Sequence, residues 1–591
     1  MLWYDDSYTS AVPRIRLRAA RDVWQSAAGR SEPKAQSARL AAFVGLSQVL
    51  QGVADAALAA RGLDDETPAT GELGSALHAL AAVLARPDDP AAGEQEASRL
   101  LEALAEDGEG DWRDETIACR APEGYAFYAV YPEAYADAAR RSGLGADTQV
   151  IGLRSIGTGL AAMVAAALGA ETAATLRPVG QPFDRSVVPG PGLLRRWQAA
   201  SRSAAFAVVD EGPGASGSSF RAAVRCLEEC GVPRDRIHLF PSHANGPGAA
   251  SRPEWREAWA GFNRHPADID AFLGLDGAGD VRRLEGWIAK ATGTDVRSVR
   301  DVSAGRWREV FWPDSETLPP VAPALERRKI LAETGRGPVI ARFAGLGQPG
   351  EDKLALARAL AACGFVPEPY GLACGFLVER WQEGARPATT AQDRERILAV
   401  LPDYLAARAH LFPGLGRRGA SLPALAAMVR RNAAVRFGPQ GEAAGAALAA
   451  RASALVEKVR PICIDGRLDL CEWLVDEGGR VLKADAIDHH DDHSLVGCQD
   501  LAWDVAGAAA ELHLDTAQTR ALCGAIGERG VPQPDWDLVS FYTPCYAASR
   551  LAADCLARDM AGPGEEGERL ERRADGYAHR LAATLGMRES P

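Results

Sequence analysis

The sequence lacks the features of a disulfide scaffold, a zinc module or a secreted protein. Its 11 cysteines are scattered through 591 residues without a Cys-x-x-Cys pair. Cys226 and Cys230 lie four apart on an expected helix, but no second cluster completes a zinc site. The first residues, Met1 to Asp6, lack the basic region and apolar core of a signal peptide. We therefore expect free thiols in a reducing, cytoplasmic environment.

The sequence also has no excess of positive charge and no long apolar run. It contains 66 Lys and Arg against 79 Asp and Glu, a formal net charge of −13. This balance argues against broad binding to nucleic acids or anionic membranes, which requires a basic surface. No segment reaches the ~20 consecutive apolar residues of a membrane helix. We expect neither a nucleic-acid partner nor a membrane partner.

What the sequence does have is enough apolar material for several folded cores. Aromatic residues make up only 7%, but 47% of the residues are hydrophobic. A chain of this length suggests about three to five compact units. The patterning predicts an α/β plus α+β protein with three parts: a helical accessory region over residues 1–112, a parallel-sheet domain over 113–320 and a third domain over 321–591.

The expected elements follow from the period of the apolar residues. Residues 35–104 have helical spacing. In the central part, apolar runs alternate with amphipathic segments, which is typical of a parallel sheet with crossover helices. The expected central strands are 125–130, 148–152, 205–209 and 237–240, and the expected helices are 160–168 and 220–229. In the third part we expect a strand at 339–343, a helix at 353–363 and a hairpin at 473–483.

The segment from Phe206 to Phe220 carries the clearest chemistry. An apolar strand leads to two adjacent acids, Asp210 and Glu211, and a loop of small residues then leads into a helix. Backbone N–H groups in such a loop can approach a phosphate, and the positive end of the helix favours the negative charge. The two acids can accept hydrogen bonds from sugar hydroxyls. The segment therefore favours a ribose 5-phosphate ligand, whereas an ordinary strand–turn–helix is the plain alternative.

This order of strand, two acids, small-residue loop and helix resembles the signature of type I phosphoribosyltransferases. The resemblance implies a Rossmann-like central domain that uses phosphoribosyl pyrophosphate (PRPP), with Asp210 and Glu211 on the ribose hydroxyls. The loop departs from the usual form by about one residue and contains Pro213. The resemblance places the 5-phosphate at the loop residues Gly214, Ala215, Ser216, Gly217, Ser218 and Ser219.

A second loop upstream strengthens the expectation of a phosphate-binding site. The strand-like Val150–Leu153 is followed by Arg154, Ser155, Gly157 and Thr158 at the start of a helix, where the same fold places its pyrophosphate loop. Between the two loops, Arg177 and Arg185 could neutralise pyrophosphate, although a solvated loop is equally open. The acceptor cannot be identified; Pro122–Pro132 and Ser242–Gly246 are candidates for its pocket.

The third part resembles the aminoglycoside-phosphotransferase branch of the protein-kinase-like fold, which implies a bilobal domain that binds ATP. Arg342 occupies the place of that family's strand lysine, and Phe376–Trp381, with Glu379 and Trp381, resembles the adenine hinge. The segment from Asp465 to Glu472 corresponds to the catalytic loop, and Lys483 and Asp485 follow the hairpin. On this resemblance Glu472, Asp485 and Asp488 would hold Mg²⁺, and Asp504 would have a structural role.

One departure affects the expected chemistry. The position of the catalytic base is occupied by Arg467, which cannot accept a proton at neutral pH. Asp465 or Asp469, two residues to either side, could serve instead, or the lobe could bind nucleotide without turnover. The run from Asp488 to His493 could hold a transition metal, contact phosphate or be a solvated charge cluster.

These features predict a bifunctional transferase. A phosphoribosyl group would pass from PRPP to an unknown small acceptor, and an ATP- and Mg²⁺-dependent phosphotransfer would act on that product or a related hydroxyl. Two alternatives remain open: a hydrolase on the same central fold, and a regulatory protein that senses PRPP and nucleotides. A homodimer is also open.

Overall fold

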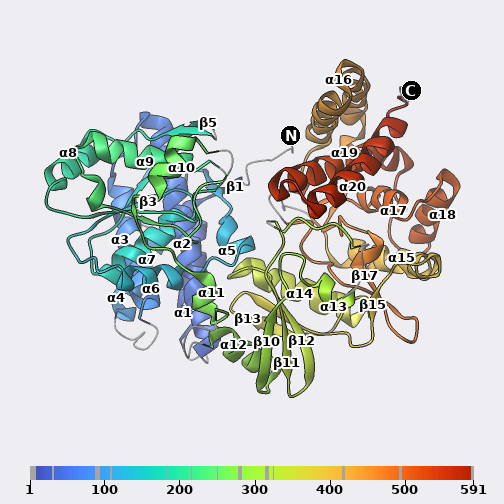
Figure 1. Ribbon diagram of the computed structural model, residues 1–591, viewed down its shortest axis with the longest axis horizontal. Helices are drawn as coiled ribbons and strands as arrows, with labels where there is room; N and C mark the ends of the chain where they lie inside the picture. Colours follow the sequence, from blue (N-terminus) through green and yellow to red (C-terminus); the bar gives the residue numbers. More distant parts are fainter. Residues whose placement is uncertain are drawn as a thin grey trace. The chain divides into compact units, whose positions relative to one another are not determined.

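The computed structural model describes residues 8–28, 32–86, 93–106, 110–181, 183–214, 216–248, 251–276, 282–312, 318–323, 325–414, 419–491 and 495–587. Its contacts divide the chain into two compact units (Figure 1). The N-terminal unit comprises the described residues of Ser7–Trp287 with Gly345–Pro349, and the C-terminal unit comprises those of Ile288–Ala344 and Gly350–Pro591. The helical accessory region and the parallel sheet thus share one unit, whereas the expected boundaries at 112 and 320 stay predictions.

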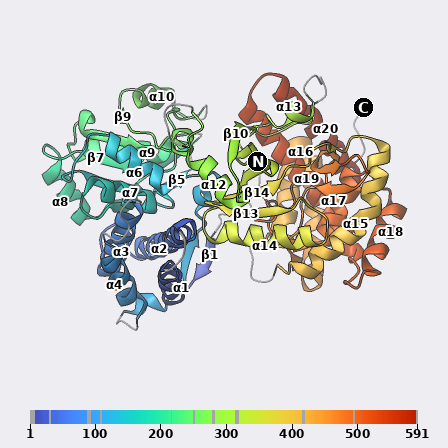
Figure 2. The ribbon, with the colours of Figure 1, turned by 90° about the horizontal axis from the view of Figure 1, so that it is seen from below.

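The N-terminal unit begins with a helical layer, as the apolar spacing of residues 35–104 predicts (Figure 2). A capping box formed by Thr67 and Thr70 begins the third helix, and the side chains of Leu73, Leu77 and Leu80 are buried along one of its faces. The elements are β1 (Tyr8–Ala11), α1 (Pro13–Gln25), α2 (Glu32–Arg61), α3 (Pro68–Leu84) and α4 (Glu94–Ala105), and β1 pairs antiparallel with β2 (Ile117–Arg120).

Among the described residues, one helix is long and apolar enough to cross a membrane. It spans Lys34–Arg61 within α2, with a mean hydropathy of 1.3 in its most apolar window. In the structure 67% of that window is buried, because α2 packs against α1, α3, β2 and α7. The core helix of a folded protein has the same composition.

A five-stranded sheet lies next in the chain, and all its hydrogen-bonded pairs are parallel. All four residues of β7 are buried, as expected for a strand covered on both faces. This confirms the strands expected at 148–152, 205–209 and 237–240 and the helices expected at 160–168 and 220–229. The sheet order is β4 (Ala174–Leu176), β3 (Gln149–Leu153), β7 (Phe206–Val209), β8 (Ile237–Phe240) and β9 (Asn263–Arg264).

Helices and a short ribbon connect these strands. The two crossovers that matter for the site are α7 (Gly157–Leu168), which follows β3, and α9 (Ser218–Glu229), which follows β7. The other elements of this unit are α5 (Glu123–Phe127), α6 (Pro132–Arg141), β5 (Val179–Gln181), β6 (Asp184–Ser186), α8 (Pro191–Ala200), α10 (Pro253–Trp259), α11 (Ile269–Leu273) and the start of α12 (Arg283–Thr292).

The strand expected at 125–130 is wrong, because this segment begins with helix α5. Its alternating aromatic residues resemble a buried strand, but the backbone bonds close locally: Ala126 N–H donates to the Pro122 carbonyl, and Val130 N–H to the Gly124 carbonyl. Tyr125 and Phe127 are buried all the same. Tertiary packing therefore selects the helix over the period of the side chains.

The C-terminal unit opens with a five-stranded antiparallel sheet. In it, β12 pairs with β11 on one side and with β14 on the other, and Arg342 lies opposite Leu377. This confirms the expected strand at 339–343, and the expected helix at 353–363 is α14 (Gln348–Ala362). The sheet order is β10 (Val296–Asp301), β11 (Lys329–Thr334), β12 (Gly337–Phe343), β14 (Phe376–Arg380) and β13 (Pro369–Ala373).

The rest of this unit is mostly helical around short strands. The hairpin expected at 473–483 is present as β17 (Trp473–Val475) and β18 (Val481–Lys483). Helix α16 (Leu422–Leu455) bends at Gly438, whose φ of 65° and ψ of −150° are not helical, before Pro439. The remaining elements are α13 (Arg308–Phe311), β15 (Arg386–Pro387), α15 (Ala391–Leu411), β16 (Pro461–Ile462), β19 (Gln499–Asp500), α17 (Ala502–Glu511), α18 (Thr516–Gly527), α19 (Trp536–Ala561) and α20 (Glu565–Thr584).

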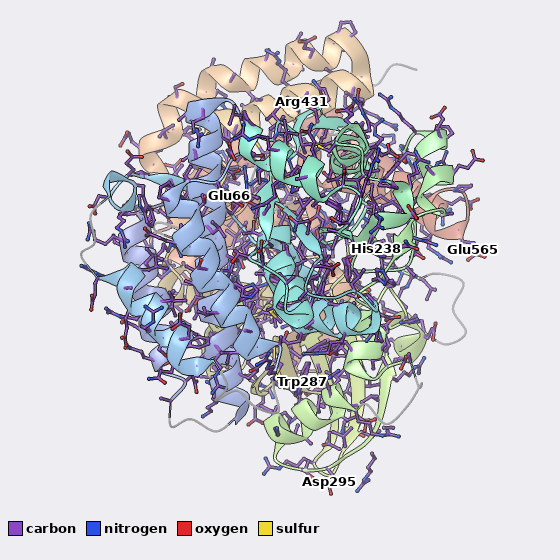
Figure 3. The ribbon with its side chains drawn as sticks, turned by 90° about the vertical axis from the view of Figure 1, so that its left-hand side faces the viewer. Glu66, His238, Trp287, Asp295, Arg431 and Glu565 are labelled. Atoms are coloured by element: carbon purple, nitrogen blue, oxygen red, sulfur yellow. The ribbon has the colours of Figure 1, made fainter. Side chains whose placement is uncertain are left out.

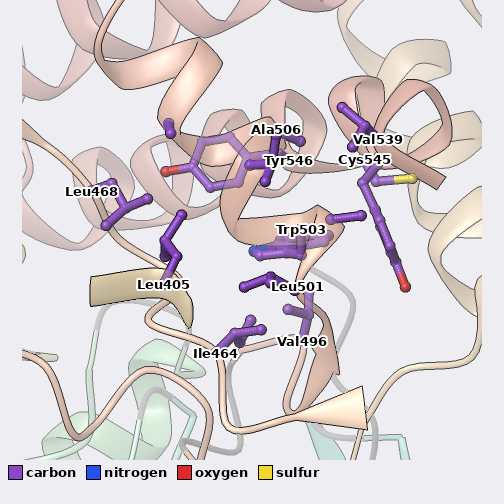
Figure 4. Close-up of a cluster of buried hydrophobic side chains, with 14 of the residues drawn as sticks. Leu405, Ile464, Leu468, Val496, Leu501, Trp503, Ala506, Val539, Cys545 and Tyr546 are labelled. Atoms are coloured by element: carbon purple, nitrogen blue, oxygen red, sulfur yellow. The ribbon is translucent and has the colours of Figure 1, made fainter. Parts of the chain in front are cut away.

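The core of the helical part surrounds Trp503 of α17 (Figure 4). Leu405, Ile464 and Leu501 converge on it from separate segments, and Tyr546 of α19 contacts its ring with centroids 5.7 Å apart. This packing joins the segment at 464–468 to α17 and α19, so it fixes the base of the loop that carries Asp465, Arg467 and Asp469.

A buried ion-pair cluster joins the helical layer to the parallel sheet. The Arg154 Nε lies 2.9 Å from Asp55 Oδ1, and its Nη2 lies 2.5 Å from Asp64 Oδ1. Arg177 also pairs with Asp55, and its backbone N–H donates to Asp64 Oδ2 over 2.8 Å. The side chains of Arg154 and Asp64 are only 2% and 3% exposed. Glu66, labelled in Figure 3, lies in the same α2–α3 connection, but its pair with Arg196 is solvent-exposed.

We expect Asp64→Ala to destabilise the N-terminal unit by about 3 kcal/mol, because it leaves a buried guanidinium incompletely paired. The matched control is Glu66→Ala, which removes an exposed pair and should cost no more than about 1 kcal/mol. Urea unfolding followed by circular dichroism measures both. Equal losses for the two variants would contradict a structural role for the Asp64–Arg154 pair.

Candidate functional site

The main cavity of the C-terminal unit has a volume of about 270 Å³ and lies between the antiparallel sheet and the helical part. Strand β12 contributes Ile340 and Arg342, and Glu379 and Trp381 lie at the end of β14. The opposite wall consists of residues from the segment 465–472, from the hairpin and the segment that follows it, and from α19 and α20. It includes Arg467, Asp469, Glu472, Leu474, Asp485, Asp488, His489, Arg550, Asp554 and Arg573.

One part of the cavity is apolar and suits a flat ring. It is lined by Ile340, Pro367, Trp381 and Leu474. The Phe311 ring stacks on Trp381 with centroids 5.2 Å apart and an interplanar angle of 25°. The backbone N–H of Trp381 donates to the Pro338 carbonyl over 3.1 Å, which fixes the position of the segment after β14. An aromatic base could pack between these side chains.

The charged part of the cavity centres on the buried guanidinium of Arg342. Its Nε lies 2.8 Å from Glu379 Oε2, and its Nη1 lies 2.8 Å from Asp485 Oδ1 and 3.7 Å from Asp488 Oδ2. The three carboxylates raise the pKa of Arg342 further, in opposition to burial. Arg342 thus holds β12, β14 and the segment after β18 together.

Two lysines complete the charge balance of this region. The Lys353 Nζ of α14 lies 2.9 Å from Asp488 Oδ1. The fully buried Lys483 lies 3.4 Å from Glu472 Oε2 and donates to the Asp485 carbonyl. Burial alone would raise the pKa of Asp485 and Asp488, but Arg342 lowers the first and Lys353 the second below their ordinary value. Both carboxylates are therefore ionised at neutral pH.

The turn that carries the expected catalytic residues is fixed by Asp504. Its Oδ2 accepts the Asp465 N–H and its Oδ1 the Gly466 N–H, each over 2.9 Å. Gly466 has a φ of +78°, which favours glycine. The Asp465 carboxylate is fully buried and accepts hydrogen bonds from the Tyr404 hydroxyl and the Arg467 N–H. Asp465 is therefore already bound within the core.

Asp469 also has a partner. Arg550 of α19 donates to its two carboxylate oxygens over 3.3 and 3.2 Å. Burial would raise the pKa of Asp469, but Arg550 and Arg573 lower it below its ordinary value. Next to this pair, Arg573 of α20 binds both oxygens of Asp554 over 2.7 and 2.8 Å. The charges of this wall are thus largely compensated.

The run from Asp488 to His493 is only partly described by the structure. Asp488 and His489 line the cavity, and the His489 Nδ1 lies 2.9 Å from the Asp465 carbonyl oxygen. Asp491 Oδ2 is 3.8 Å from the Lys353 Nζ, while Asp492 and His493 lie outside the described residues. Within the described ranges, His, Cys, Asp and Glu form no group of three or more that could hold a metal ion.

Sequence reasoning did not single out three residues that shape this cavity. Lys353 belongs to an amphipathic pattern that resembles a solvated helix face, yet its side chain is 2% exposed. Arg408 of α15 is buried and donates to the carbonyls of Cys463, Ile464 and Ala486, so it holds the turn and the segment after β18 together. Arg550 lies in a long helix without a recognisable motif. No local signal marks any of them.

The N-terminal unit brings the two expected phosphate loops together. They follow β3 and β7, which are adjacent parallel strands, so both lie at the carboxyl edge of the sheet. A Cβ atom at Gly157 would lie 2.7 Å from the Val209 carbonyl and 3.4 Å from Asp210 Oδ1. Only glycine allows the loop before α7 to approach the acidic pair this closely.

The loop before α9 is stabilised by its own small residues. Gly217 has a φ of +64°, and a Cβ there would lie 2.5 Å from the Trp255 Nε1. The Ser216 Oγ accepts the Ser218 N–H over 3.3 Å, and Arg185 Nη1 donates to Ser219 Oγ over 2.9 Å. Arg185 therefore points toward this loop. Gly214 is exposed, and Ala215 lies outside the described residues.

The other expected pyrophosphate contacts are placed differently. Arg154 and Arg177 are bound to Asp55 and Asp64 in the structural ion-pair cluster described above. Thr158 is buried at the start of α7, and Ser155 is half-buried in the turn before it. The structure thus joins Gly157, Asp210, Glu211 and the loop before α9, whereas the two guanidiniums serve the neighbouring helices.

Both segments proposed for the acceptor pocket adjoin the acidic pair. A Cβ at Gly124 of α5 would lie 2.9 Å from Glu211 Oε2, and the Ser242 N–H donates to the Glu211 carbonyl over 2.5 Å. The Tyr135 hydroxyl of α6 donates to the carbonyls of Asp210 and Glu211. The backbone of the acidic pair is therefore held from both sides.

The acidic pair carries little compensating charge. Burial raises the pKa of Asp210 to about 7, and Arg185 and Arg120 offset this only in part. Burial and the neighbouring Asp210 raise the pKa of Glu211 to about 8. Two adjacent carboxyls that resist ionisation would gain from a bound cation or from hydroxyl donors. This electrostatic state is opposite to that of Asp485 and Asp488.

No protein-family model matches the chain, and no curated protein matches it in sequence. Among solved structures it is similar to choline kinase LicA from Streptococcus pneumoniae, with 15% identity, a TM-score of 0.33, and coverage of 50% of this chain and 98% of that chain. It is similar to spectinomycin phosphotransferase APH(9)-Ia in complex with ADP and spectinomycin (11% identity, TM-score 0.35, 52% and 98% covered). A macrolide 2′-phosphotransferase type I is a third neighbour (14% identity, TM-score 0.30, 52% and 96% covered).

We expect Glu211→Gln to change how stability depends on pH. Because the folded pKa of about 8 exceeds the ordinary 4.5, the folded state binds more protons than the unfolded state between these values. The free energy that this carboxyl contributes to folding therefore falls as the pH rises from about 5 to 8, and it stays constant above that range. Between pH 5 and pH 8, the difference in unfolding free energy between the variant and the natural chain should therefore shift in favour of the variant by at least about 1 kcal/mol. Urea unfolding at pH 5, 6.5 and 8 measures this, and parallel profiles for both proteins would contradict it.

Proposed function

We propose that the C-terminal unit binds Mg-ATP in its main cavity and transfers a phosphoryl group to a small molecule. The observation that carries this proposal is one cavity with an apolar slot beside Trp381 and, further in, Arg342 among three carboxylates. An adenine ring fits the first and a polyphosphate with its metal fits the second. The kinase-like resemblance of the sequence agrees with this arrangement.

The oxygen donors in the cavity are of the type that suits magnesium, although as they lie the described residues form no metal-binding group of three. Glu472, Asp485 and Asp488 all line it, and Mg²⁺ prefers hard carboxylate oxygens beside phosphates. Both oxygens of Asp488 are buried without a hydrogen bond, although Lys353 forms an ion pair with one of them. A metal held here would neutralise charge on the transferring phosphoryl group. Arg342 would contact the polyphosphate, and Trp381 with Leu474 would hold the base.

A nucleotide-binding protein without turnover is the second candidate. The observation that favours it is the state of the turn: Asp465 and Asp469 are both engaged, and Arg467 between them cannot accept a proton. Release of ADP from Mg-ATP in the presence of candidate acceptors distinguishes the two. Tight binding without ADP release would favour a regulatory protein.

For the N-terminal unit we propose a site for PRPP at the carboxyl edge of the parallel sheet. It is supported by the close approach of the Gly157 backbone to Asp210, where a Cβ would lie 3.4 Å from Asp210 Oδ1, and by the serine-rich loop before α9. Asp210 and Glu211 would accept hydrogen bonds from the ribose hydroxyls, and Ser218 and Ser219 would donate to the 5-phosphate. Transfer to a small-molecule acceptor, in cooperation with the phosphotransfer, would make the protein a bifunctional transferase. Pyrophosphate release without an added acceptor would favour the hydrolase instead.

For the nucleotide site, Asp485→Ala should weaken Mg-AMP-PNP binding more than tenfold, because it removes a charged metal contact. Asp403→Ala is the matched control; this exposed aspartate pairs with Arg529. Isothermal titration with magnesium and then with EDTA separates the magnesium-dependent part of the AMP-PNP affinity from the rest. In Asp485→Ala only the magnesium-dependent part should be lost. Unchanged magnesium-dependent affinity in Asp485→Ala would show that the metal role is assigned to the wrong residue.

For the sugar-phosphate site, the double variant Asp210→Asn, Glu211→Gln should lose at least about tenfold in PRPP affinity while it stays folded. The control pair Glu229→Gln, Asp235→Asn changes the same residue types at the surface of the same unit. Isothermal titration and circular dichroism measure binding and folding. If the double variant binds PRPP as the natural chain does, the acidic pair has no part in holding the ribose.

A further inference from the structure

One guanidinium of the main cavity has no partner of its own. Within the described residues, the Arg467 side chain makes neither a hydrogen bond nor an ion pair within 4.0 Å, and its Nε is buried. Its neighbours differ in this respect, because Arg550 is bound to Asp469 and Arg573 to Asp554. A half-buried guanidinium without a counter-ion is unfavourable unless a ligand supplies one.

The two nearest acids in the chain are bound by other side chains, although Arg467 interacts with Asp469 at longer range and helps to lower its pKa. The residue two positions before it, Asp465, accepts the Tyr404 hydroxyl within the core. The residue two positions after it, Asp469, is taken by Arg550. Asp504 fixes the backbone of this turn through the N–H groups of Asp465 and Gly466. Rotation of either carboxylate toward Arg467 would break the hydrogen bond from Tyr404 or the two from Arg550.

We infer that Arg467 forms an anion-binding subsite that receives a carboxylate or phosphate group of the acceptor molecule. This inference rests on the proposed nucleotide site in the same cavity. The nucleotide phosphates already have Arg342 and the metal carboxylates, whereas Arg467 belongs to the wall formed with Asp469 and Arg550. A guanidinium binds such oxyanions through two parallel N–H groups. The acceptor is therefore an anionic small molecule rather than a neutral one.

The test uses the full chain and inorganic phosphate as the probe. Isothermal titration measures phosphate binding to the free chain and to the chain saturated with Mg-AMP-PNP. We expect phosphate to bind in both cases and Arg467→Gln to lose at least about tenfold in phosphate affinity. Arg467→Lys should retain part of it, since it keeps the charge but not the two-pronged geometry. Arg430→Gln, at an exposed arginine of the same unit, should bind as the natural chain does.

Each other outcome has a definite meaning. Phosphate affinity that is equal in Arg467→Gln and the natural chain, or absent from both, overturns the subsite. If Arg467→Gln loses Mg-AMP-PNP affinity as much as phosphate affinity, Arg467 serves the nucleotide and the inference is wrong. If the natural chain binds no Mg-AMP-PNP but binds phosphate through Arg467, the nucleotide proposal fails while the anion subsite stands.

Discussion

The cavity of the C-terminal unit depends on one buried guanidinium, that of Arg342. It connects Glu379 on the neighbouring strand with Asp485 and Asp488 beyond the hairpin, so the sheet and the loop cannot separate without leaving charge buried and unpaired. Lys353 adds a second cation to Asp488. These cations keep Asp485 and Asp488 ionised, whereas burial raises the pKa of Glu379. An oxyanion that enters the cavity would compete with Asp485 and Asp488 for Arg342 and Lys353.

The N-terminal unit has a different electrostatic arrangement at the edge of its parallel sheet, where two adjacent carboxyls lack a neighbouring cation among the described residues. Asp210 and Glu211 have no ion-pair partner within 4.0 Å among the described residues, and their pKa values are raised to about 7 and 8. Gly157 and Gly124 bring the backbone close to them, and a side chain at either position would crowd the pair. Groups in this state favour ligands that donate hydrogen bonds or bring a cation. The nearby arginines that could have compensated the pair, Arg154 and Arg177, instead hold the helical layer through Asp55 and Asp64.

Local pattern predicted much of the secondary structure but little of the charge pairing. The fully apolar run of β7 and the mostly apolar run of β8, which includes His238, identify buried parallel strands, and the turn at Glu477–Gly479 identifies a hairpin. The aromatic alternation around Tyr125 predicts a strand, but the segment begins with a helix because its backbone hydrogen bonds close locally. Lys353, Arg408 and Arg550 could not be recognised, since each acts through partners more than 50 residues away in sequence. The same long-range pairing determines that Arg154 is structural, which its position in a glycine-rich turn does not reveal.

The turn that carries Arg467 shows why the identity of a single side chain matters here. Asp504, Gly466 and Arg408 fix its backbone whatever residue stands at position 467, so the side chain there must face its part of the cavity. A carboxylate at 467 would add negative charge next to Asp469, Glu472 and Asp485, each of which already needs a cation. The guanidinium instead gives that wall a positive charge that no carboxylate of the described residues holds within 4.0 Å. A positive charge in this state attracts anions and gives no help in removing a proton.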